Sequence, residues 1–195
     1  MKIKFSFFCV LLLVLSSCDD DYVPKPKAFL RLDYPKATYK KTKLPKMPVA
    51  FEMSSLVNNV TTKTISGSTE SYGANLEYKP LKATLFLTYK GIHKDKTKLK
   101  DFLIDAQKLT LEHTKKADEI PVYPYENKER RVYGKLSEVK GDAASLVQFY
   151  VTDSVNHFLT GSLYFNVKPN YDSILPAADY LQKDIQRIIE TLEWQ

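Results

Sequence analysis

The middle of the chain alternates hydrophobic and polar residues with a period of two. This alternation runs through residues 72–78 and 81–89, on both sides of Lys79 and Pro80. Because successive side chains of a strand point to opposite faces of a sheet, the pattern predicts an antiparallel hairpin with one wet face. Further strands are expected at residues 49–53, 60–65, 130–139, 145–153 and 157–167. The prolines of residues 120–126 predict an irregular segment or an edge strand.

Two segments follow the helical period of 3.6 residues instead. The first covers residues 99–117, with Thr97 expected to cap its start and lysines at its carboxyl end. The second covers residues 174–193 and gathers its apolar residues on one face, with Pro176 in a first turn that tolerates proline. We expect this second helix to close the core and Trp194 to be buried beside the sheet.

These elements predict an α+β fold. We expect an antiparallel sheet of about six to eight strands with two long helices packed on it, preceded by an extended Pro/Lys-rich tether. The arrangement loosely resembles the PsbP-like and Mog1-like sandwiches. Three parts are predicted: a signal peptide at residues 1–17, an acylated cysteine and tether at residues 18–47, and one globular domain at residues 48–195.

The amino-terminal residues have the features of a bacterial lipoprotein signal. Lys2 and Lys4 give a positive end, and residues 5–15 form an apolar run. That run is shorter than the roughly 20 apolar residues that span a bilayer, but it fits the apolar region of a secretory signal. Residues 15–18 (Leu-Ser-Ser-Cys) resemble the lipobox, whose cysteine is acylated and becomes the first mature residue. The pattern predicts lipid attachment at Cys18 and anchoring to a membrane.

The tether contains side chains that a passive spacer does not need. Prolines recur along it and favour extended backbone, yet Phe29, Leu32 and Tyr34 interrupt its polar background. These residues and Arg31 could pack on the domain as a strap or contact a partner protein. Alternation along an extended strap leaves the Arg31 guanidinium for a carboxylate. We expect the strap to dock mainly on its own domain, with Arg31 exposed for a partner.

Charge and cysteine content exclude several classes of protein. The formal net charge is +6, and it falls to +4 when Lys2 and Lys4 leave with the signal. Such a mild excess, spread along the chain, does not indicate nucleic acid binding. The two cysteines are Cys9 in the signal and Cys18 at the lipid site. The folded part therefore has no thiol for a disulfide, a nucleophile or a metal.

No catalytic or metal-binding pattern stands out. His93, His113 and His157 fall in a loop, on a helix face and at a strand start, without the spacing of a zinc site. The six glycines are scattered, so no phosphate-binding loop is present, and neither GxSxG nor SxxK occurs. We expect no enzyme activity, no metal and no cofactor.

Three blocks of sequence carry a family resemblance. They are the lipobox, the run PKPKAFLRLDYP at residues 24–35 and the closing Thr-Leu-Glu-Trp at residues 191–194. With these blocks the chain resembles the gliding motility lipoprotein GldD family. The resemblance implies a non-catalytic accessory component of the gliding motility and type IX secretion machinery, acting through protein–protein contacts. It also implies a place in the cell envelope, facing the periplasm or the cell surface, with the membrane protein GldE as a partner.

A second class of function remains open at this point. Tyrosines cluster at positions 123, 125 and 133, and lysines crowd residues 36–46. Core packing and a solvated linker explain these features, but an aromatic rim and a basic tether also suit a binding module. Its ligand would be a glycan, a peptidoglycan fragment or a small molecule.

Two short motifs predict a covalent modification. Residues 153–155 and 172–174 each read Asp-Ser-hydrophobic, which matches an O-glycan acceptor associated with the phylum in which GldD-like proteins occur. Ser154 and Ser173 are therefore candidate O-glycosylation sites. Asp and Ser are also common turn and helix-capping residues, so both interpretations stay open.

Overall fold

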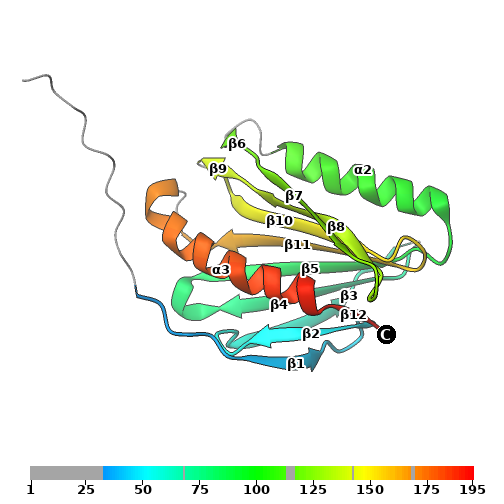
Figure 1. Ribbon diagram of the computed structural model, residues 1–195, viewed down its shortest axis with the longest axis horizontal. Coiled ribbons are helices and arrows are strands. Elements are labelled where there is room, and N and C mark those ends of the chain that lie inside the picture. Colours follow the sequence, from blue (N-terminus) through cyan, green and yellow to red (C-terminus); the bar gives the residue numbers. More distant parts are fainter. Residues whose placement is uncertain (1–32, 68, 113–116, 142, 168–169) are drawn as a thin grey trace, which may run out of the picture.

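A seven-stranded antiparallel sheet forms the centre of the molecule (Figure 1). The computed structural model describes residues 33–67, 69–112, 117–141, 143–167 and 170–195. The sheet has the strand order β3-β4-β5-β11-β10-β8-β7. Its strands are β3 (Asn59–Thr64), β4 (Ser71–Tyr78), β5 (Ala83–Gly91), β7 (Val122–Asn127), β8 (Val132–Glu138), β10 (Ser145–Thr152) and β11 (His157–Phe165).

The remaining elements surround this sheet. A small sheet, in the order β1-β2-β12, joins the beginning of the described chain to its end. Its strands are β1 (Tyr39–Lys43), β2 (Val49–Ser54) and β12 (Glu193–Trp194). The other elements are the pair β6 (Ala117–Glu119) and β9 (Lys140–Gly141), the 3-10 turn η1 (Lys79–Leu81), and the helices α2 (Lys96–Glu112) and α3 (Tyr171–Thr191). The predicted α+β class is confirmed.

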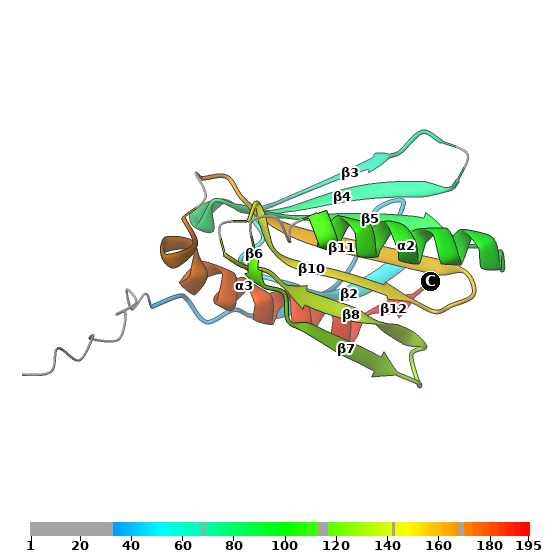
Figure 2. The ribbon, with the colours of Figure 1, turned by 90° about the horizontal axis from the view of Figure 1, so that it is seen from above.

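The two helices cover opposite faces of the large sheet. Phe158 of β11 packs in a small cluster with Phe102 of α2, and Figure 2 shows α2 lying across β11. The next residue, Leu159, belongs instead to the main core, which includes Leu181 and Ile185 of α3. Because successive strand residues point to opposite faces, α3 and α2 lie on different sides. The main core therefore fills the space between the large sheet, α3 and β2.

The strand predictions hold, with hairpins set by local sequence. β4 and β5 pair antiparallel around Lys79 and Pro80, as the alternation predicted. β8, β10 and β11 form the predicted meander. The proline-containing β7 lies at the edge of the sheet, where the missing N–H of Pro124 does not break an interior ladder.

The helix boundaries differ from those predicted. α2 begins at Lys96, because Asp95 Oδ1 accepts hydrogen bonds from the N–H groups of Thr97 (2.9 Å) and Lys98 (3.1 Å). Asp95, not Thr97, is the capping side chain. The described helix ends at Glu112, and Ala117 lies in β6 rather than in the helix. His113 and the lysines that follow it lie outside the described residues.

α3 begins earlier than its apolar pattern indicated. Asn170 is its N-cap and accepts a hydrogen bond from the Ser173 N–H, so the helix starts at Tyr171. Pro176 therefore falls in the second turn and not in the first. The capping residues carry no hydrophobic signal, which explains why periodicity placed the start three residues too late.

The domain also begins earlier than residue 48. β1 pairs with β2 along its full length, from Tyr39 to Lys43, and both Leu44 and Met47 are buried in the main core. The sequence concealed this strand because β1 is an edge strand rich in lysine, with exposed side chains and no apolar alternation. Part of the predicted tether is thus a structural strand of the domain.

Trp194 is half-buried instead of fully buried. Its ring stacks on His157 with centroids 5.1 Å apart, and its Nε1–H donates to the Arg131 carbonyl oxygen at 3.1 Å. These contacts hold β12 against the end of the large sheet. No helix in the described part of the chain has the length and hydrophobicity that crossing a bilayer requires.

Candidate functional site on helix α3

One side of α3 carries a row of polar and aromatic residues, which we call the α3 stripe. It consists of Tyr180, Asp184, Arg187 and Thr191. Their spacing of four, three and four residues places them on the same side of a helix. The stripe borders the apolar face with which α3 covers the core. It receives the amino-terminal part of the described chain.

At the Tyr180 end of the stripe, α3 contacts the amino-terminal segment at Tyr34 and Pro35. The rings of Tyr34 and Tyr180 stack with centroids 4.6 Å apart and an interplanar angle of 23°. The Tyr180 hydroxyl donates a hydrogen bond to the carbonyl oxygen of Pro35. Burial raises the pKa of both tyrosines, so both hydroxyls stay protonated and neutral. Tyr34, which was predicted as a possible partner contact, therefore packs on its own domain.

A buried carboxyl group forms the middle of the stripe. Asp184 is only 2% exposed, and its Oδ1 accepts a hydrogen bond of 2.6 Å from the Tyr39 hydroxyl of β1. Its Oδ2 has no hydrogen-bond partner within the described residues. Burial raises the pKa of Asp184, and the hydroxyls of Tyr39 and Ser54 oppose that rise. Burying a carboxylate costs free energy, and the hydrogen bond from Tyr39 offsets part of this cost for Asp184.

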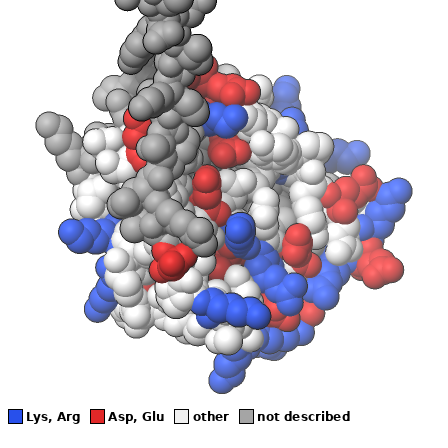
Figure 3. Space-filling model, turned by 60° about the vertical axis from the view of Figure 1, so that its left-hand side comes forward, with Lys and Arg blue, Asp and Glu red and all other residues white. Residues whose placement is uncertain are grey.

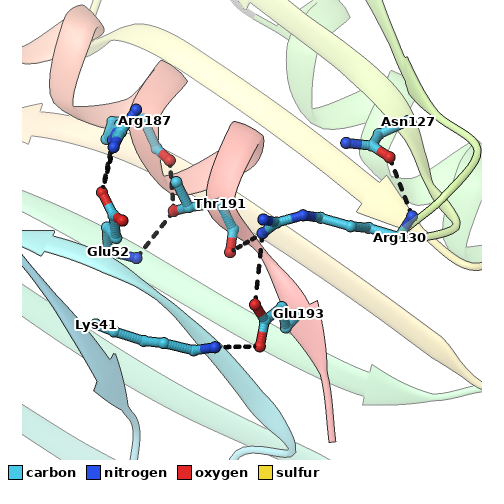
Figure 4. Close-up of polar contacts among 7 residues, drawn as sticks. All are labelled: Lys41, Glu52, Asn127, Arg130, Arg187, Thr191 and Glu193. Atoms are coloured by element: carbon cyan, nitrogen blue, oxygen red, sulfur yellow. Dashed lines mark hydrogen bonds and ion pairs between the residues drawn. The ribbon is translucent and has the colours of Figure 1, made fainter.

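An ion-pair network surrounds the end of the stripe formed by Arg187 and Thr191 (Figure 4). Arg187 Nε donates to Glu52 Oε2 of β2 at 2.7 Å, and Nη2 lies 2.5 Å from the same oxygen. Thr191 Oγ1 accepts from the Glu52 N–H at 2.9 Å and donates to the Arg187 carbonyl oxygen at 2.7 Å. Through these bonds α3 and β2 are joined by side chains as well as by the apolar core.

The network continues to β1 and to the turn between β7 and β8. Glu193 lies 2.5 Å from Lys41 Nζ and 3.6 Å from Arg130 Nη1. Arg130 also donates to the Thr191 carbonyl oxygen at 2.9 Å. The hydrogen bond from Lys41, with the positive charges of Lys41 and Arg130, lowers the pKa of Glu193. Exposed ion pairs each stabilise weakly, so this network contributes mainly by fixing the geometry of the carboxyl end.

The structure tests the predicted strap only in part. Tyr34 lies on Tyr180, whereas Cys18, Phe29, Arg31 and Leu32 lie outside the described residues. The residues that hold Tyr34 were not predicted as site residues. In the sequence these residues show only the spacing of one helix face. A helix face exposed to solvent has the same spacing, so the sequence does not identify them as a contact site.

The two predicted glycosylation residues are both exposed. Ser154 sits in the β10–β11 turn with a φ of 64°, and Ser173 lies in the first turn of α3. Asp153 beside the first of them is buried, and its Oδ1 accepts from the N–H groups of residues 155, 156 and 157. The Asp of the first motif thus builds the turn, and that turn presents Ser154 to solvent.

The two described histidines make different direct contacts. His93 lies 2.8 Å from Glu70, while His157 contacts the Tyr89 hydroxyl at 2.8 Å and stacks on Trp194. Across the ranges that the structure describes, no three His, Cys, Asp or Glu side chains are grouped to hold a metal ion. On the face shown in Figure 3, basic and acidic side chains are interspersed, and no large region carries one sign.

Fold and site together define an α+β domain whose amino-terminal segment is strapped to its last helix. The model of the family described as gliding motility lipoprotein GldD matches residues 19–194, so the chain belongs to this family. Membership supports a role in gliding motility and implies a membrane-anchored place in the cell envelope. No curated protein matches the chain. No solved structure matches it either.

Proposed function

We propose that the chain is a non-catalytic component of the gliding motility and type IX secretion machinery, anchored through acylated Cys18 and acting by protein–protein contact. It faces the periplasm or the cell surface, and the membrane protein GldE is its candidate partner. The observation that carries this proposal is the docking of Tyr34 and Pro35 on the α3 stripe. Membership of the GldD family supports the same role.

The docked strap limits how far the domain reaches from the lipid. Tyr34 follows Cys18 by 16 positions. Whatever its conformation, that length of chain spans at most about 55 Å, because an extended chain rises about 3.3–3.6 Å per residue. If Tyr34 were released from α3, the chain would be loose only as far as Tyr39 at the start of β1, and the limit would be about 70–75 Å. Docking on α3 therefore shortens the maximal distance between the lipid and the domain by about 15–20 Å.

The order of residues along the chain supports the proposed partner contacts. In the sequence, Phe29, Arg31 and Leu32 come between Cys18 and Tyr34, so a partner that binds them would sit between the membrane and the domain. Arg31 would pair with a partner carboxylate, and the apolar neighbours would gain free energy from burial against it.

Substitutions on both sides of the tyrosine stack test the docking. We expect Tyr34→Ala and Tyr180→Ala each to impair spreading on agar and to reduce co-purification of partner proteins from solubilised membranes. The control is Tyr123→Ala, which removes an exposed tyrosine from edge strand β7. Normal spreading and full co-purification in both Tyr34→Ala and Tyr180→Ala would contradict the proposal that docking of Tyr34 is needed for function.

A longer tether tests the effect of the distance between lipid and domain without changing the stability of the domain. Ten Gly-Ser residues inserted after Asp21 leave the Tyr34 contact in place but extend the maximal span by about 35 Å. We expect this insertion to impair spreading with an unchanged melting temperature. An equal insertion in the β3–β4 loop at Gly67, which lies away from the tether, serves as a control. If cells that carry the tether insertion spread normally, the limited distance between the lipid and the domain has no role in spreading.

Partner contact through Arg31 requires a separate test. Arg31→Glu reverses the charge that we propose to face a partner carboxylate, and it should reduce co-purification without lowering the melting temperature. Arg31→Lys keeps the charge but not the bidentate geometry, so it should have a smaller effect. A loss of stability in Arg31→Glu would show instead that Arg31 packs on its own domain.

The glycosylation of Ser154 and Ser173 belongs to the same proposal. The exposed turn makes Ser154 the better acceptor of the two. We expect the mature protein to carry excess mass that falls in Ser154→Ala and falls again when Ser173→Ala is added. A mature mass equal to that of the acylated peptide alone would exclude the modification.

A further inference from the structure

A cleft of about 340 Å³ lies between α2 and the outer face of the large sheet. Its roof is the carboxyl half of α2, from Leu103 to Leu111, and its side is formed by Ile120 and Val122. Its floor comes from β8, β10 and β11. The α3 stripe lies on the other side of the sheet, so the cleft is separate from the contacts that Tyr34 and Pro35 make.

The floor of the cleft is polar although a helix covers it. Gln148 of β10 lies in register with Ser137 of β8 and with Ser162 of β11. All three are buried. Two residues further along β10, a second row repeats the arrangement. Its members are Lys135, Tyr150 and Thr160. A face that only had to pack against α2 would present apolar side chains, as the opposite face does.

Gln148 is the central residue of this floor. It is only 3% exposed. Its Oε1 lies 3.1 Å from Thr110 Oγ1 of α2, and the same hydroxyl oxygen lies 3.2 Å from the Ala106 carbonyl oxygen. Its Nε2 has no acceptor within the described part of the chain. Because a buried donor without an acceptor costs free energy, Gln148 is a poor choice for packing alone. Its donor suits a ligand that brings an oxygen acceptor into the cleft.

The other lining residues define the rest of the ligand. The roof presents Leu103, Ala106 and Leu109, and Val122 stands at the side. Lys135 is the one charged residue among the described lining residues, and no acidic side chain joins it. Lys135 lies diagonally across from Gln148, at a separation of about 7–8 Å between backbone positions that a lysine side chain spans. This lining suits an apolar body with a negatively charged end.

We propose that the cleft binds a small amphipathic carboxylic acid. Its carboxylate accepts from Gln148 Nε2 and faces the Lys135 ammonium group, and its hydrocarbon part lies against Leu103, Ala106 and Val122. A cleft of this volume is at the lower end of the range for ligand sites, which favours a ligand of medium chain length. The inference rests on the cleft alone and does not depend on the proposed function.

Photolabelling of the full chain in lipid nanodiscs tests the proposal. The probe is decanoic acid with a diazirine at its far end, and labelled peptides are identified by mass spectrometry. We expect the label on residues 96–112. Unlabelled decanoate should compete with the probe and reduce this labelling, whereas decylamine should not. Label spread along the chain, or equal protection by decylamine, would overturn the proposal.

Three variants make the test specific to the floor. Gln148→Met conserves volume but removes the donor, so labelling should fall about tenfold while the melting temperature is kept or raised. Lys135→Gln changes an exposed residue and should also reduce labelling, which keeps the test valid if Gln148→Met misfolds. Thr88→Val is the matched control, because Thr88 pairs with Thr160 but does not line the cleft. Unchanged labelling in Lys135→Gln and in a folded Gln148→Met would refute the carboxylate assignment.

Discussion

Replacing Tyr39 by phenylalanine isolates the contact on which the buried Asp184 depends. The substitution removes one hydroxyl and keeps the ring, so the 2.6 Å hydrogen bond to Oδ1 is lost with little change in packing. Oδ2 already has no partner in the described chain, and the residue is 2% exposed. Loss of a hydrogen bond to a charged buried group costs about 1.5–3 kcal/mol. We therefore expect Tyr39→Phe to lower the melting temperature by about 3–12 °C at a pH where Asp184 is ionised.

The cost of this substitution should depend on pH. Burial raises the pKa of Asp184 above its value in the unfolded chain. The folded protein therefore binds this proton more tightly than the unfolded chain does. The stability that this group contributes is fully present below the unfolded pKa and is lost as the pH rises through the folded pKa. With Asp184 protonated, Tyr39→Phe removes only a neutral hydrogen bond, which is worth about 0.5–1.5 kcal/mol.

Urea unfolding at two pH values measures this difference. The unfolding free energies of the wild type and Tyr39→Phe are compared at about pH 8 and at the lowest pH at which both remain folded. Tyr123→Phe is the control, because its hydroxyl makes only an exposed 3.3 Å contact with Glu138, and it should change stability by less than about 0.5 kcal/mol. A Tyr39→Phe cost that is equal at both pH values, or larger in acid, would refute the reasoning.

Three further predictions concern the sheet and its ends. Gly134→Ala should destabilise the protein by about 3 kcal/mol in urea unfolding, because a Cβ there would lie 1.9 Å from a carbonyl oxygen of β10. Gly67→Ala, with no atom within 4 Å, should be neutral. The fluorescence of Trp194 should change as the stacked His157 is protonated, with a midpoint below about 6.5 because burial lowers the pKa of that histidine. Ser154→Gly should raise stability by about 0.5–1 kcal/mol in urea unfolding, since the φ of 64° strains any side chain.

The sequence by itself determined the elements whose signal is local. Alternation over residues 72–89 specified the β4–β5 hairpin, and the helical period located α2 and α3. These patterns survive in a single sequence because each element buries one face, and burial imposes its own period on neighbouring residues. The family was also readable, from the block at residues 24–35 and the closing residues of the chain.

Elements without an apolar period required the tertiary structure. β1 is a lysine-rich edge strand, so nothing in its own sequence separates it from the tether until β2 lies beside it. The caps Asp95 and Asn170 lie outside the periodic segments, which is why both helix starts were misplaced. In each case the deciding interaction is a hydrogen bond, which leaves no hydrophobic pattern in the sequence.

The candidate sites were decided only by the tertiary structure. The Tyr39–Asp184 hydrogen bond and the Tyr180–Pro35 hydrogen bond each join residues 145 positions apart. The floor around Gln148 exists because three strands align their registers under a helix. A polar residue in a sequence shows neither its depth nor its neighbours, because both depend on how distant segments pack. The fold class followed from local periodicity, whereas the strap contact and the cleft arise from contacts between distant segments.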